Sequence, residues 1–115
     1  MLLLLTDGTI HDMPQTKQLM VDLSSMPCSV IIVGVGDADF SAMEELDGDG
    51  GLLRDNMGRA VSRDLVQFVT FKEAMHRGDL AEQVLREVPD QTCRYMERIN
   101  FAPQAVPQDM QQFAA

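Results

Sequence analysis

Hydrophobic positions along the chain follow two kinds of pattern. Residues 1–5 and 29–35 are continuous apolar runs bounded by turn residues, which favours strands buried on both faces, as in a parallel sheet covered by helices. Between them, after Asp12, apolar positions recur every three or four residues with Pro14 in the first turn, which predicts a helix. Strand, helix and strand in this order predict a right-handed βαβ unit with parallel strands. The predicted buried face of the helix consists of Thr16, Leu19, Met20, Leu23 and Met26.

The second half of the chain repeats this alternation of element types. Residues 40–46 predict a short helix capped by Asp39, and residues 65–71 predict a third strand. A helical segment starts at Asp79, and Pro89 is predicted to break or kink it. The apolar stripes before and after that proline are Leu80, Val84, Leu85 and Val88, then Cys93, Tyr95, Met96 and Ile99.

These elements predict an α/β fold with a Rossmann-like open parallel sheet flanked by helices. A chain of 115 residues with 45% apolar and 23% charged residues has the size and composition of one folded globular domain. Residues 1–101 carry the patterned segments. Residues 102–115 are rich in proline and glutamine and predict a polar tail.

The net charge excludes some classes of binding partner, and the cysteine content indicates the cellular compartment. A net charge of −9 argues against nucleic acid, and against direct binding to an anionic membrane without a bridging cation. Cys28 and Cys93 have neither metal-ligand spacing nor a dense disulfide pattern, so we expect reduced thiols in a cytoplasmic protein. Residues 1–5 lack the basic flank and the length of a signal peptide, and no apolar run is long enough to span a bilayer.

The turn Thr6-Asp7-Gly8 holds the most interesting candidate residue. Asp7 follows a predicted buried strand, and open α/β sheets bind ligands beyond the carboxyl ends of their strands. The same tripeptide is also a common turn sequence at the end of a strand, so the alternative that these residues only form a turn stays open. One carboxylate does not complete a site for Mg²⁺, which takes six oxygen ligands, some of them water.

Two other acidic stretches resemble ligand motifs and fail on their spacing. The loop 47–58 begins like a calcium-binding EF-hand, but Leu52 stands where glycine is needed and Gly58 where a bidentate glutamate is needed. The segment GVGDAD is not a dinucleotide fingerprint, because Asp39 replaces its third glycine.

Neither histidine belongs to a recognisable catalytic arrangement. We expect His11 and His76 at the surface, without a nucleophile beside them. Four of the nine methionines fall on predicted apolar faces, where core packing explains them better than a pliable binding surface. These are Met20, Met26, Met43 and Met96.

Several blocks of this sequence resemble one family. The segments LLLLTDGTIHDM, MPCSVIIVGVGDADFSAMEELDGD, RDLVQFVTF and LAEQVLREVPDQ are similar to the carboxyl-terminal half of the von Willebrand factor type A domain of copines, over residues 2–99. The resemblance implies that the three strands are the fourth, fifth and sixth of a six-stranded sheet ordered 3-2-1-4-5-6. Residues 1–101 are then a partial domain, whose strand 1–5 has a bare edge that favours self-association.

The resemblance also implies a metal site. Such domains bind Mg²⁺ or Mn²⁺ through an Asp-x-Ser-x-Ser motif, a threonine and a later aspartate. Asp7, flanked by Thr6 and Gly8, matches the last position, and no Asp-x-Ser-x-Ser occurs in this sequence. We therefore expect metal binding in an intact domain and low affinity in this chain alone.

The expected function is that of a binding module without catalysis. The resemblance implies a fragment of a copine-like, calcium-dependent phospholipid-binding protein that binds protein partners through this domain. Calcium would act through C2 domains not present in this chain, recruiting a cytoplasmic protein to membranes. The alternative is the copine-like domain of a RING-type ubiquitin ligase, although two isolated cysteines cannot build a RING. A small α/β hydrolase or transferase is disfavoured, because no nucleophile, base and oxyanion donor can be placed together.

Overall fold

The computed structural model describes residues 1–48 and 52–111. Residues 49–51 of the predicted loop 47–58 and residues 112–115 of the predicted tail lie outside the described residues. The strands are β1 (Leu2–Thr6), β2 (Val30–Gly34) and β3 (Val66–Thr70). The helices are α1 (Met13–Leu23), α2 (Ser41–Asp47), α3 (Phe71–His76), α4 (Leu80–Leu85), α5 (Val88–Arg98) and α6 (Gln108–Gln111). None of these helices is long and apolar enough to cross a membrane.

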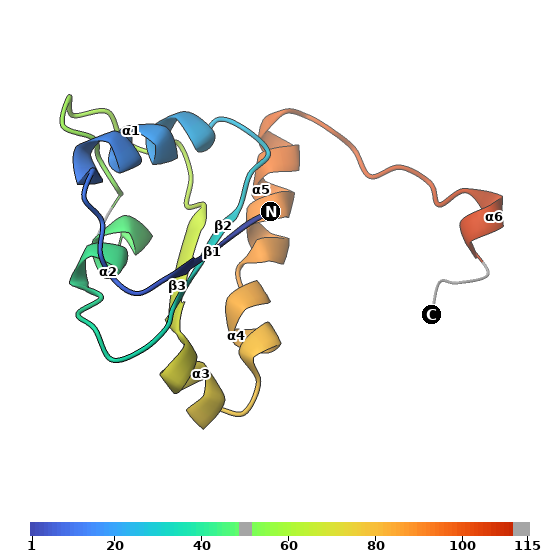
Figure 1. Ribbon diagram of the computed structural model, residues 1–115. Coiled ribbons are helices and arrows are strands. Elements are labelled where there is room, and N and C mark those ends of the chain that lie inside the picture. Colours follow the sequence, from blue (N-terminus) through green and yellow to red (C-terminus); the bar gives the residue numbers. More distant parts are fainter. Residues whose placement is uncertain (49–51, 112–115) are drawn as a thin grey trace.

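The three strands form one parallel sheet in the order β1-β2-β3, which confirms the predicted α/β architecture. Leu2 pairs with Val30, and Val30 pairs in turn with Val66, so the three strands start at the same level. Helices α1 and α2 lie on one side of the sheet and α4 and α5 on the other (Figure 1). All three strands therefore direct their carboxyl ends to one edge of the molecule, as a ligand crevice requires.

The central strand β2 carries the core. All five of its residues are buried, because it has a strand on each side and helices over both faces. Val30 and Ile32 belong to the main hydrophobic cluster, together with Met20 of α1 and Met43 of α2. The continuous apolar run 29–35 is thus correctly interpreted as a strand buried on both faces.

Strand β1 forms as predicted, but the expectation that it is buried on both faces is wrong. Leu2, Leu3, Leu4 and Leu5 are 42%, 57%, 37% and 70% exposed, because β1 is the edge strand of the described sheet. The amide of Leu2 donates to Ser29, and the carbonyl of Thr6 accepts from Val35. Alternate residues of a strand bond to opposite sides, so Leu3 and Leu5 direct their peptide groups to the open edge.

Helix α1 is shorter than its apolar spacing suggests. Pro14 lies in its first turn as expected, but the helix ends at Leu23, which leaves Met26 outside it and 51% exposed. The side chain of Ser24, the residue that follows the helix, is buried and accepts a hydrogen bond from the amide of Ser62. Leu19 is 60% exposed, so its predicted place on the buried face is wrong.

Helix α3 was not expected between the third strand and Asp79. Thr70 accepts a hydrogen bond at 3.2 Å from the amide of Glu73, so the spacing Thr-x-x-Glu at residues 70–73 is a helix start of the capping-box type. The predicted start of α4 is confirmed, because Asp79 accepts from the amide of Glu82.

The break between α4 and α5 lies two to three residues earlier than predicted. Pro89 occupies the first turn of α5, where a missing amide costs nothing, and the chain leaves the helix at Arg86 and Glu87. Gln67 of β3 stabilises this junction: its side chain donates to the carbonyl of Gln83 and accepts from the amide of Glu87. Leu85 and Ile99, assigned to the apolar stripes, are 42% and 48% exposed.

The end of the chain extends away from the sheet (Figure 1). Residues 101–110 are exposed, and the short helix α6 forms within the segment that the sequence predicts to be a polar tail.

Candidate functional site

Asp7 lies where the sequence predicts, directly after β1 at the carboxyl edge of the sheet. Its Oδ1 accepts a hydrogen bond at 3.4 Å from the amide of Thr9, and the hydroxyl of Thr6 accepts one at 3.1 Å from the amide of Gly8. These bonds show that the residues do shape a turn. The Asp7 side chain is nevertheless exposed, and a carboxylate has further lone pairs available for a ligand.

Gly8 allows this turn to pack against the loop that follows β2. Its φ is +107°, and a Cβ there would lie 2.9 Å from the carbonyl oxygen of Asp39 and 3.2 Å from Ala38 and Phe40. Both the backbone angle and the space therefore require glycine. The Asp7 turn and the loop of residues 35–40 form one continuous surface at this edge of the sheet.

The ring of Phe40 packs against Gly8 in the Asp7 turn and against Gly34 at the end of β2. A Cβ on Gly34 would lie only 2.7 Å from its Cε1 atom, so the ring rests directly on the backbone at the end of β2. The ring centroid of Phe40 is 5.6 Å from that of Phe68 on β3, at an interplanar angle of 47°. Phe40 thus links the end of β2 and the middle of β3 to the start of α2.

The acidic side chains near Asp7 have other partners. Asp37 forms an exposed ion pair with Lys72 at 3.3 Å, and Asp39 accepts from the amide of Ser41 at the start of α2, although Phe40 rather than Asp39 occupies the capping position. Within residues 1–48 and 52–111, no three histidine, cysteine or acidic side chains come close enough to hold a metal ion. The described part of this chain therefore supplies one carboxylate and one hydroxyl, which does not fit a complete Mg²⁺ or Mn²⁺ site.

The remaining candidates do not join this site. His11 and His76 are exposed, as expected. Cys28 and Cys93 are both free, with Cys93 exposed and Cys28 half-buried. Of the four methionines assigned to packing, Met20 and Met43 are buried and Met96 is partly buried, whereas the assignment of Met26 is wrong because its side chain is 51% exposed.

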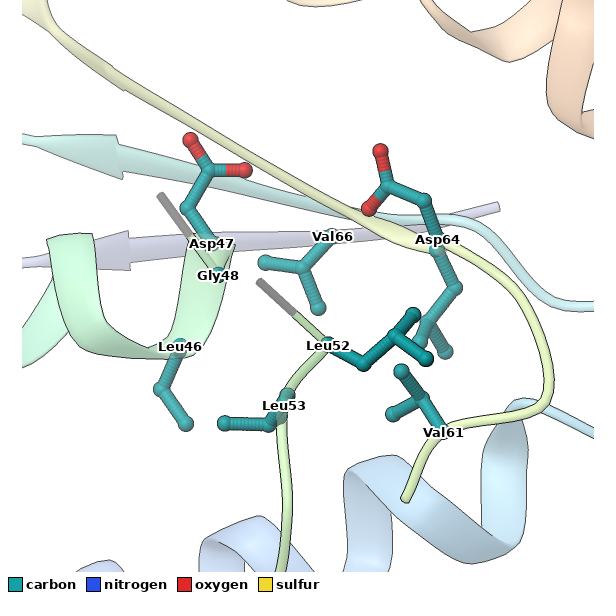
Figure 2. Close-up of a pocket in the computed structure, with 9 residues that line it drawn as sticks. Leu46, Asp47, Gly48, Leu52, Leu53, Val61, Asp64 and Val66 are labelled. Carbon is teal, nitrogen blue, oxygen red and sulfur yellow. The ribbon is translucent and has the colours of Figure 1, made fainter. Parts of the chain in front are cut away.

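A small cavity of about 170 Å³ opens between α2 and the start of β3 (Figure 2). The carboxylates of Asp47 and Asp64 lie on its far side from Leu53 and Val61. Burial raises the pKa of Asp64, although a backbone hydrogen bond and two arginines oppose this. The cavity lies at the amino end of β3, away from Asp7, and two carboxylates alone do not define a metal centre.

The segment between Leu52 and Asp64 contains a buried carboxylate, that of Asp55, which the sequence does not reveal. Asp55 accepts hydrogen bonds from the amides of Met57 and Arg59 and from the Arg59 guanidinium, at 2.8–3.0 Å. Arg59 also reaches Asp22 on α1 at 3.2 Å. Burial alone would raise the pKa of Asp55, but these bonds outweigh it, so its net pKa lies below the ordinary value. These bonds tie the segment around Asp55 to itself and to α1.

This pKa shift predicts a pH-dependent contribution to stability. A carboxyl whose pKa is lower in the folded than in the unfolded chain stabilises the fold above its ordinary pKa of about 3.9, and the contribution is lost as pH falls through the folded value. We expect Asp55→Asn to lower the urea midpoint at pH 6, and the difference from the unchanged chain to shrink toward pH 3. Urea unfolding at several pH values measures this. A difference that stays constant over this range would contradict the assignment.

A comparison with protein families agrees with this geometry. A family model described as Copine matches residues 1–104, nearly the whole chain. The copine domain is similar to the von Willebrand factor type A domain, and the parallel sheet with flanking helices agrees with part of such a domain. The chain belongs to the copine family.

Proposed function

We propose that this chain is part of the von Willebrand factor type A module of a copine-like protein, and that the module binds protein partners. The observation that carries the proposal is the position of Asp7, in a chain of the copine family. Asp7 is exposed at the carboxyl edge of a parallel sheet, next to the free edge of β1. In an intact domain its carboxylate would be one ligand of a Mg²⁺ or Mn²⁺ site, with the remaining ligands from other segments.

The proposal extends to the whole protein. A net charge of −9 makes this chain itself a poor ligand for anionic lipid, so calcium-dependent phospholipid binding would require C2 domains elsewhere in the protein. In this proposal the whole protein is cytoplasmic, its C2 domains bind membranes when calcium is present, and this module binds protein partners. No catalytic step is assigned to this chain, because the residues near Asp7 form turns and ion pairs rather than a nucleophile with its base.

Metal titration of the isolated chain tests the role of Asp7. With one carboxylate available, we expect Mg²⁺ and Mn²⁺ to bind more weakly than about 1 mM, the weak end of divalent sites in proteins. Isothermal titration calorimetry measures this, with Asp7→Ala as the test variant and Asp37→Ala as the matched control, since Asp37 is an exposed acid on the neighbouring loop. Micromolar binding that is lost only in Asp7→Ala would show that the chain holds a complete site by itself.

A further inference from the structure

Ser62 lies in the segment that leads into the amino end of β3, at the opposite end of the strands from Asp7. The residue is exposed and belongs to no helix or strand. Its amide donates to the Ser24 hydroxyl, and its own hydroxyl donates to the Ser24 carbonyl, both at 2.9 Å. The backbone of this segment is therefore held in place next to Ser24, while Ser62 remains open to solvent.

Arg98, at the end of α5, reaches the same hydroxyl. Its Nη1 donates to Oγ of Ser62 at 2.6 Å. Within residues 1–48 and 52–111, no carboxylate forms an ion pair with Arg98. Hydrogen bonds from a guanidinium to an anionic oxygen are about twice as strong as those between neutral groups. Arg98 thus directs its charge at Ser62 and has no acidic partner there.

A second guanidinium, that of Arg63, adds positive charge beside Ser62. Burial is the main cause that lowers the pKa of Arg63, and the charge of Arg98 lowers it further, so the two guanidinium groups lie close enough to repel each other. Asp64 is the acidic neighbour of this pair, and its carboxylate interacts with Arg94 as well as with Arg63. A further anion at Ser62 would offset the repulsion between Arg63 and Arg98.

The sequence around Ser62 has the charge pattern of a kinase substrate. Arg59 stands three residues before Ser62, and Arg63 follows it directly; no other serine or threonine has an arginine within the three preceding positions. Kinases select their substrates partly by such patterns of charge. The Arg59 side chain is 46% exposed, so a kinase reaches it in competition with Asp22 and Asp55.

We propose that Ser62 is a phosphorylation site and that Arg98 binds the phosphate. The phosphoryl donor is ATP, and the enzyme is a serine kinase selective for arginine on the amino side of the serine. Oγ of Ser62 forms a bond to the γ-phosphorus as the bond from that phosphorus to ADP breaks; ADP leaves with the electron pair, and the hydroxyl proton passes to the catalytic aspartate of the kinase. The attached phosphate has a charge of about −1.5 to −2 at pH 7 and accepts charge-assisted hydrogen bonds from arginine. Phosphorylation thus ties the end of α5 to the segment before β3.

Treatment of the folded chain with ATP and a kinase of this selectivity tests the modification. We expect one phosphoryl group per chain, located at Ser62 by mass spectrometry of peptide fragments. Ser62→Ala should abolish the incorporation. Ser25→Ala is the matched control and should leave it unchanged, since Ser25 is exposed but has no arginine before it. A chain that takes up no phosphate, or one that takes it up equally with Ser62→Ala, would overturn the proposal.

The phosphate itself reports whether Arg98 binds it. A neighbouring guanidinium favours the dianion, so we expect the second pKa of the phosphate in the folded chain to be about 5.5 or lower, compared with about 6 for an ordinary phosphoserine. Phosphorus NMR at several pH values measures this. Arg98→Gln should return the pKa toward 6, whereas Arg77→Gln should leave it lowered, because Arg77 is an exposed arginine directly after α3. A phosphate whose pKa is the same with and without Arg98→Gln would contradict the role of Arg98.

Discussion

Replacing Leu5 by lysine is expected to abolish self-association of the isolated chain. Leu5 is the most exposed leucine of β1, at 70%, and its peptide groups face the open edge of the sheet. Strand β1 contains no charge, no proline and no bulge, so two copies can pair along it without like-charge repulsion. A lysine at this position introduces a positive charge that each copy would bring to the same interface.

Sedimentation velocity over a series of concentrations measures this effect. The unchanged chain should form dimers or larger species as concentration rises, whereas Leu5→Lys should remain a monomer. Leu19→Lys is the matched control, because Leu19 is similarly exposed, at 60%, but lies on α1. An unchanged chain that is monomeric throughout, or an equal effect of Leu19→Lys, would contradict the role of the β1 edge.

Replacing Gly34 by alanine is expected to destabilise the fold by about 1–3 kcal/mol, the usual cost of overpacking. The new Cβ would lie 2.7 Å from Cε1 of the Phe40 ring, well inside contact distance. The ring has little room to retreat, because it packs against Gly8 and Phe68. Urea unfolding measures the loss.

A double-mutant cycle separates this clash from any general effect of alanine. Phe40→Leu removes the ring, so Gly34→Ala should cost much less in that background than in the unchanged chain. Additive effects of the two substitutions would show that the ring does not restrict Gly34.

The sequence correctly predicts that β1 and β2 are strands, but it predicts the burial of β1 wrongly. Both runs are apolar enough to form strands, and both do. Burial, however, depends on neighbours: β2 has a strand on each side, whereas β1 has one. Two apolar runs of similar length therefore differ in burial: β2 is buried, whereas β1 is exposed.

Other differences come from side chains that act over short distances. The capping spacing at residues 70–73 was present in the sequence and marks the start of α3. Asp55, in contrast, has the sequence context of an ordinary loop residue, and its burial and its bonds to Arg59 are evident only in the structure.

The candidate site was predictable only in part. The position of Asp7 follows from the end of a strand, which a sequence pattern shows. The packing of Gly8 against Asp39 joins segments far apart in the chain and has no local signal.

One titration tests the central claim most directly, namely that Asp7 belongs to a metal site shared with a strand beside β1. The chain is mixed with a copine segment that contains a strand followed by the Asp-x-Ser-x-Ser motif, and Mg²⁺ binding is measured by calorimetry. We predict binding in the mixture that neither part shows alone and that Asp7→Ala removes. A mixture that binds Mg²⁺ no better than its parts, or equally well with Asp7→Ala, would contradict the account.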